Sequence, residues 1–170
     1  MKKILRLLLA AAVLTVLWRL PFRGTDAAKL IPVKTVIVTR SGDRYVVDVG
    51  AGAKGLGRSL SAALADLRAG VSGEIFFPTA EQVILAGEAA GDPEALKAAA
   101  EEPEFRPAAG VYLSPEADPD PEAVGNYLRS HPADTTVMEV RAALRAGRTP
   151  RVPLLLERNG GYRVAFPEPR

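Results

Sequence analysis

The chain has no cysteine and only one histidine among its 170 residues. Without cysteine, disulfide frameworks, thiol nucleophiles, iron–sulfur clusters and the usual structural zinc sites are excluded. A single imidazole also argues against a histidine-rich catalytic or metal centre. Most of the familiar active sites are thereby excluded, and we expect no metal and no cofactor.

Low-complexity composition is also lacking, since apolar residues make up 48% of the chain and charged residues 25%. These proportions are typical of a folded globular body, and the length allows one domain with an attached segment. The net charge of +2 is unevenly divided: residues 1–30 carry six basic side chains and one acidic one, whereas the other 140 residues carry 16 and 19. Because the excess of basic residues lies outside the predicted body, nucleic acid is not an expected partner.

The N-terminal segment contains an unbroken apolar run over residues 7–18, with two lysines before it and two arginines after it. As a helix rising about 1.5 Å per residue, residues 4–22 would span about 27 Å, close to the roughly 30 Å hydrocarbon core of a bilayer. We therefore predict a signal or anchor segment at residues 1–29, and an extracytoplasmic domain at residues 30–170 on a bacterial membrane.

The sequence allows this segment to be either a cleaved signal peptide or an uncleaved anchor. A signal peptidase prefers small residues at the first and third positions before the cut, and Thr25 and Ala27 offer the best match. The arginines and proline that precede them make this a poor cleavage site, so we favour an uncleaved anchor helix with a cytoplasmic N-terminus.

The remaining chain contains a mixture of short strand and helix patterns. Helices are predicted after Ser59, Asp92, Asp120 and Thr136, each of which can cap a helix N-terminus, and Glu139 completes a capping box with Thr136. Apolar or β-branched runs predict strands at residues 34–40, 44–49, 74–78, 82–86, 111–113, 152–157 and 162–166. Strict alternation of strand and helix is not seen, so we expect an α+β domain with a mainly antiparallel mixed sheet and short helices.

One glycine motif invites a cofactor interpretation. Residues 50–55 read Gly-Ala-Gly-Ala-Lys-Gly, the spacing of dinucleotide-binding loops. The predicted helix begins only after Ser59, however, and the preceding strand belongs to a hairpin instead of a strand–helix–strand unit. A flexible glycine loop is the favoured interpretation.

Two further features have simpler explanations than chemistry. The alternating carboxylates of Glu116, Asp118, Asp120 and Glu122 resemble a calcium loop, but neighbouring prolines stiffen the segment and no glycine permits the required turn. His131 falls at the predicted end of a helix, where a cation interacts favourably with the helix dipole. We expect a solvated linker and a capping residue.

A resemblance to a known family becomes visible over residues 33–155. It rests on a short leucine helix, the paired phenylalanines Phe76 and Phe77, an apolar strand ending in Gly-Glu at residues 87–88, and Pro-Glu-Phe-Arg at residues 103–106. A Val-Pro-Leu-Leu strand at residues 152–155 matches the end of the same domain. The chain thus resembles the N-terminal domain of Ger(x)C proteins, the C subunits of spore germination nutrient receptors.

The family differs from this chain in two ways. Its members are lipoproteins anchored through a cysteine, whereas this chain has none. They also continue into later domains where this chain ends. Both differences are compatible with a reduced relative that a helix anchors in the membrane.

The resemblance implies a non-enzymatic, membrane-tethered domain with no catalytic residue. Such a domain docks to other membrane proteins, namely receptor-like subunits of the spore inner membrane. The residues it offers for docking are Phe76, Phe77, Glu104 and Arg106. The simpler interpretation places both phenylalanines in the core and joins Glu104 to Arg106 as a surface ion pair. An exported hydrolase and an unrelated extracytoplasmic sensor or adaptor are the alternative functions.

Overall fold

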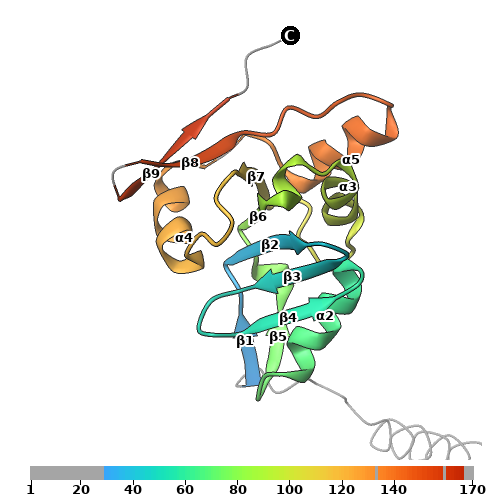
Figure 1. The fold of residues 1–170 in the computed structure, drawn as a ribbon, viewed down its shortest axis with the longest axis vertical. Helices are drawn as coiled ribbons and strands as arrows, with labels where there is room; N and C mark the ends of the chain where they lie inside the picture. The colour runs from blue at the N-terminus through green and yellow to red at the C-terminus, as the bar shows by residue number, and fades with distance from the viewer. Residues whose placement is uncertain (1–28, 133, 159, 167–170) are drawn as a thin grey trace, which may run out of the picture.

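The computed structural model describes residues 29–132, 134–158 and 160–166. The described chain forms nine strands and four α-helices (Figure 1). The strands are β1 (Leu30–Pro32), β2 (Thr35–Ser41), β3 (Arg44–Asp48), β4 (Lys54–Gly57), β5 (Glu74–Phe76), β6 (Gln82–Gly87), β7 (Gly110–Ser114), β8 (Leu154–Arg158) and β9 (Gly161–Ala165). The helices are α2 (Leu60–Ala69), α3 (Pro93–Glu101), α4 (Pro121–Ser130) and α5 (Val137–Arg145), together with the 3-10 turns η2 (Phe77–Thr79) and η3 (Glu88–Gly91).

Seven strands form the main sheet in the order β4-β3-β2-β6-β7-β8-β9. The α+β class with a mixed sheet is confirmed, but the expected antiparallel majority is wrong. Within this sheet β2, β6, β7 and β8 run parallel, and antiparallel hairpins form the two ends, so three of the six neighbouring pairs are parallel. The physical reason is that α3 carries the chain back between β6 and β7, and α4 with α5 carries it back between β7 and β8. Such crossovers return the chain to the same end of the sheet.

The four predicted helix starts are confirmed. The side chains of Ser59, Asp92, Asp120 and Thr136 each accept a hydrogen bond from a backbone N–H in the first turn of their helix. Glu139 completes the capping box by accepting from the Thr136 N–H at 2.7 Å. Each cap satisfies amides that a helix cannot pair internally, which is why these starts can be predicted from local sequence.

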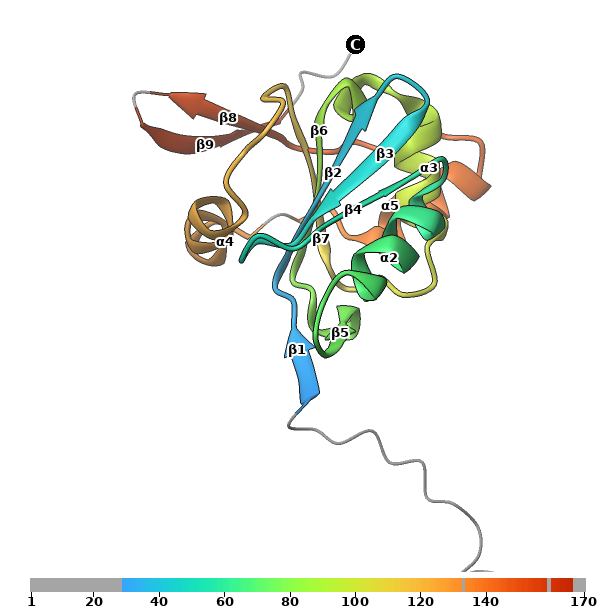
Figure 2. The same cartoon turned by 60° about the horizontal axis from the view of Figure 1, so that its bottom comes forward.

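Helices cover both faces of the sheet (Figure 2). On one face α2, α3 and α5 enclose the larger core, which contains Val36 and Val38 of β2. On the other face α4 packs over a smaller cluster that includes Ile37 and Tyr112. Neighbouring residues of β2 therefore serve opposite cores, as the alternation of side chains along a strand requires.

The glycine motif forms a tight turn followed by strand β4, so the expectation of a flexible loop is wrong for its second half. Gly50 and Gly52 have positive φ angles of 82° and 75° in the turn. In β4, a Cβ atom on Gly55 would lie 2.2 Å from the carbonyl oxygen of Ala63 in α2. Gly55 therefore permits close packing of strand on helix, and the contact involves backbone atoms that cannot move aside.

The outermost strands of the main sheet each have a backbone amide bound by a side chain. On β4 the N–H of Leu56 donates to Asp66 Oδ2 at 2.8 Å. On β9 the N–H of Val164 donates to the hydroxyl of Tyr127 at 3.3 Å. Helix α2 thus supplies a hydrogen-bond acceptor to the edge strand β4, and helix α4 supplies one to the edge strand β9.

A second, two-stranded sheet pairs β1 with β5 in parallel, with Leu30 opposite Glu74 and Pro32 opposite Phe76. The predicted strand at residues 74–78 is shorter than expected, because a 3-10 turn begins at Phe77. Proline at position 78 cannot donate to a strand ladder, which explains the early end.

The predicted anchor helix lies outside the described residues. In the part of the chain that the structure describes, no helix has the length and apolar character needed to cross a membrane.

Candidate docking site

The residues proposed for docking come from two segments that are distant in sequence but meet in the fold. Phe76 and Phe77 lie where β5 passes into η2, and Glu104 and Arg106 flank Phe105 in the connection between α3 and β7. The rings of Phe77 and Phe105 contact each other edge to face, with centroids 6.1 Å apart. This contact brings the two segments to one corner of the body.

The two phenylalanines of the pair have different environments. Phe77 is fully buried in the larger core, where the simpler interpretation places both rings. Phe76 is only half-buried, at the end of β5. A partner could therefore contact Phe76, whereas the ring of Phe77 is reached only through its neighbours.

Glu104 pairs with an arginine that the sequence did not indicate. Arg68 of α2 donates through Nη1 to Glu104 Oε1 at 2.6 Å and through Nη2 to Oε2. The guanidinium of Arg68 also lies 5.3 Å from the ring centroid of Phe77. The expected ion pair between Glu104 and Arg106 is replaced by this forked one, and Arg106 is exposed beside it.

A half-exposed, mostly apolar face lies next to this corner, on the two-stranded sheet. Paired residues of parallel strands point to the same side, so Leu30, Pro32, Glu74 and Phe76 share one face. We call these four residues the β1–β5 face: Leu30 and Phe76 are half-buried, and Pro32 and Glu74 are exposed. The opposite side carries Ile75, which is buried in the core, and Ile31, which is 39% exposed.

Hydrogen bonds fix the position of the β1–β5 face. The hydroxyl of Thr79 accepts from the N–H of Val33 at 3.1 Å and donates to the carbonyl of Phe76 at 2.7 Å. One side chain thereby joins the residue after β1 to the last residue of β5. Figure 1 shows β1 and β5 at the end of the body where the chain enters from its N-terminal segment.

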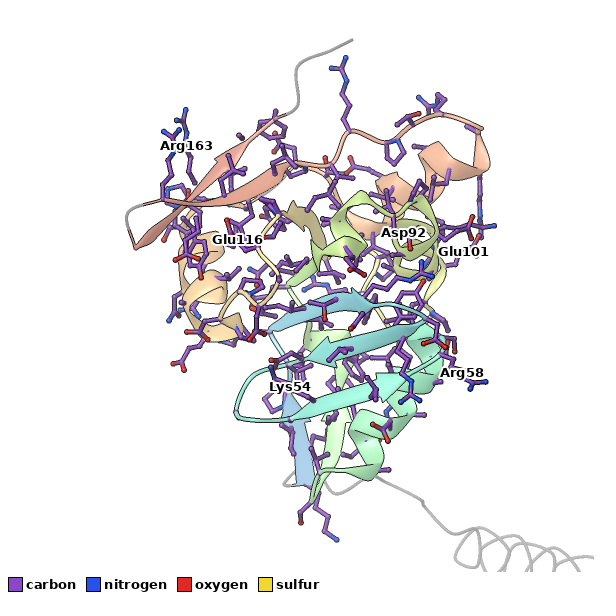
Figure 3. All side chains as sticks on the ribbon, viewed as in Figure 1. Lys54, Arg58, Asp92, Glu101, Glu116 and Arg163 are labelled. Atoms are coloured by element: carbon purple, nitrogen blue, oxygen red, sulfur yellow. The ribbon has the colours of Figure 1, made fainter. Side chains whose placement is uncertain are left out.

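Ionisable residues elsewhere form separate ion pairs that hold loops. Lys54 bridges Asp48 at 2.9 Å and Asp118 at 3.4 Å, and the bond to Asp48 raises the pKa of its ammonium group. Arg40 pairs with Asp92 in a different part of the surface (Figure 3). Partial burial raises the pKa of the Asp92 carboxyl, but its bonds to Arg40 and to the Glu94 N–H outweigh this and leave the pKa below its usual value.

The acidic stretch and the histidine occupy structural positions. Asp118 bonds Lys54 and Asp120 caps α4. No group of three or more potential ligands that could hold a metal ion occurs among the described residues. His131 follows the last residue of α4, and its ring stacks on Tyr127 with centroids 4.2 Å apart.

Comparison with known proteins does not identify a family. No family model, curated protein or solved structure matched the chain.

Sequence reasoning missed the pairing of β1 with β5 and the role of Arg68. A three-residue strand at positions 30–32 carries too little periodicity to be recognised. Arg68 lies 36 residues from Glu104 and reaches it only because α2 and the segment after α3 pack together. The apolar residues Leu30, Ile31 and Pro32, directly after the basic N-terminal segment, are the sequence signal that could have indicated the face.

Proposed function

We propose that this protein is a non-enzymatic, membrane-tethered extracytoplasmic domain that docks to other membrane proteins, as its resemblance to the N-terminal domain of a germination-receptor C subunit implies. The observation that carries the proposal is the β1–β5 face. It places half-exposed apolar side chains, together with the carboxylate of Glu74, at the end of the body that contains β1, the first described strand. An anchored domain would meet its membrane neighbours at that end.

The physical argument concerns the position and rigidity of this face. Phe76 is held by the ladder to β1, by the Thr79 bonds and by the packing of the adjacent Phe77 on Phe105. A rigid aromatic side chain loses little conformational entropy when it binds, which is one reason why aromatic residues are enriched at interfaces. The forked pair of Arg68 and Glu104 supplies a polar border close to the same corner.

Site-specific photo-crosslinking tests the proposal in the native membrane. A benzophenone side chain replaces Phe76 in the full chain, and the same side chain at Met138 of α5, which is 60% exposed, serves as the control. We expect an adduct at position 76, and none at 138, with a membrane protein encoded by a neighbouring receptor-like gene. Equal labelling from both positions, or no adduct from position 76, would contradict docking through this face.

A further inference from the structure

A cavity of about 440 Å³ opens between the start of α3, the end of α5 and the segment that leads into β8. This volume falls within the range of about 300–1,000 Å³ that is usual for small-molecule sites. Its apolar wall comes from Leu96 of α3, Leu113 of β7, Leu144 of α5 and Val152. The three leucines are half-buried and Val152 is buried, so an apolar ligand would cover surface that water now contacts.

The cavity lies at the carboxyl-terminal side of the parallel strands. It is lined by Gly91 at the end of the turn that follows β6, and by Leu113 near the end of β7. In open sheets with parallel strands, ligands bind in the crevice beyond the carboxyl ends of the strands. The β1–β5 face lies at the other end of the body, so the two surfaces are separate (Figure 1).

Two charged side chains line the cavity, and only one of them is already satisfied. Asp92 accepts from the Glu94 N–H at 2.9 Å and pairs with Arg40, so both of its oxygens have partners. Arg148 is exposed and, in the described part of the chain, forms no ion pair. The unmatched charge at the cavity is therefore positive.

The position of Arg148 is fixed by the end of α5. Its N–H donates to the carbonyl of Ala143 at 2.9 Å, and the N–H of Gly147 donates to that of Leu144 at 3.0 Å. With Gly147 at a φ of 65°, this is the Schellman arrangement that ends many helices. The turn holds the backbone of the arginine at the cavity rim, while the guanidinium is available to a ligand.

From this arrangement we infer that the cavity binds a small carboxylate with a short branched apolar group, the apolar part between the leucines and the carboxylate on Arg148. Such a group is carried by a free branched-chain acid or by the C-terminus of a peptide ending in leucine. A planar guanidinium matches a carboxylate through two parallel hydrogen bonds.

Isothermal titration calorimetry on the full chain in lipid nanodiscs tests the inference, with empty nanodiscs as the blank. The probes are 4-methylpentanoate and its neutral isostere 4-methylpentanamide, and N-acetylglycyl-leucine represents the peptide terminus. A charged hydrogen bond contributes about 1.5–3 kcal/mol, so we expect the acid to bind at least about tenfold more tightly than the amide. Tighter binding of the acetylated dipeptide than of the free acid would also support the inference, and would identify the ligand as the C-terminus of a peptide.

Four variants make the outcome specific. Arg148→Gln should remove the preference for the acid, whereas Arg145→Gln, an exposed change on α5 outside the cavity, should preserve it. Gly91→Leu should abolish binding of both probes by filling the cavity, because a Cβ at this position meets nothing within 4 Å and the fold need not adjust. Gly91→Ala is the matched control and should still bind.

Three results would overturn the inference: absence of binding, a preference for the acid that survives Arg148→Gln, or binding that persists in Gly91→Leu. If Gly91→Leu fails to fold, methyl NMR of the unmodified chain shows where the probe binds. The methyl signals of Leu113 and Leu144 must then shift with 4-methylpentanoate, and unchanged signals would reject the site.

Discussion

Replacing Phe76 and Phe77 separately tests how the corner that holds the candidate docking residues is built. Phe77 is fully buried and contacts Phe105 edge to face, whereas Phe76 is half-buried. Burial and cavity formation together make a Phe-to-Ala change in a core cost about 3–5 kcal/mol. We expect Phe77→Ala to fall in this range, and Phe76→Ala to cost about 1 kcal/mol because less of its surface is buried on folding.

Urea unfolding followed by circular dichroism gives the free energy of each variant. Since a small domain has only about 5–15 kcal/mol of stability, Phe77→Leu provides a milder change if the alanine variant does not fold. A double-mutant cycle between positions 77 and 105 isolates the contact of the two rings, which should contribute about 0.5–1.5 kcal/mol. Equal losses at positions 76 and 77 would refute the assignment of Phe76 to a surface, and a zero coupling energy would refute the contact that joins the two segments.

Further predictions concern packing, pH and the independence of the body. Gly55→Ala should destabilise the fold by more than about 2 kcal/mol in urea unfolding, because the new methyl would meet the backbone of α2, whereas Gly91→Ala should be nearly neutral. Because the pKa of Asp92 is lowered from 3.8, its pairing should stabilise the fold above about pH 4 and lose this effect as the pH falls through the lowered pKa. The difference in unfolding midpoint between the unmodified chain and Asp92→Asn should therefore shrink below pH 4, and a constant difference would contradict the pairing. A chain that begins at Leu30 should unfold cooperatively, since the two cores lie within the described residues, and a gradual loss of structure would show that the body depends on its N-terminal segment.

The parts of the fold that were predicted depend on short stretches of sequence. A cap such as Asp92 acts on amides two or three residues away, and the turn at residues 42–43 joins strands that follow one another directly. Such interactions appear in the sequence as a residue type at a fixed spacing. The central parallel strands differ, because β2 pairs with β6 across 47 residues. No residue pattern in either strand specifies which strand it pairs with. The hairpins at the two ends of the sheet were the only pairings that the sequence indicated, so we expected a mainly antiparallel sheet.

The features of the candidate site also fall into two groups: those that short stretches of sequence predict and those that arise when distant segments pack together. The apolar character of the two phenylalanines predicts that both lie in the core, which holds for Phe77 but not for the half-buried Phe76. The pairing of Pro32 with Phe76 and the bond between Arg68 and Glu104 arise from packing between distant segments. Whether the β1–β5 face docks a partner stays a prediction.

The bound amides of Leu56 and Val164 affect how this protein can associate with others. A partner that extended the main sheet by adding a strand would need those amides as donors, and each already has an acceptor on a helix of its own chain. Exposed strand edges are common starting points for aggregation, and proteins protect them in several ways. Here the two bound amides weaken any pairing of the sheet edges with a further copy of the chain. Association is thereby directed to contacts between side chains, which discriminate between partners more sharply than a backbone that is alike in every protein.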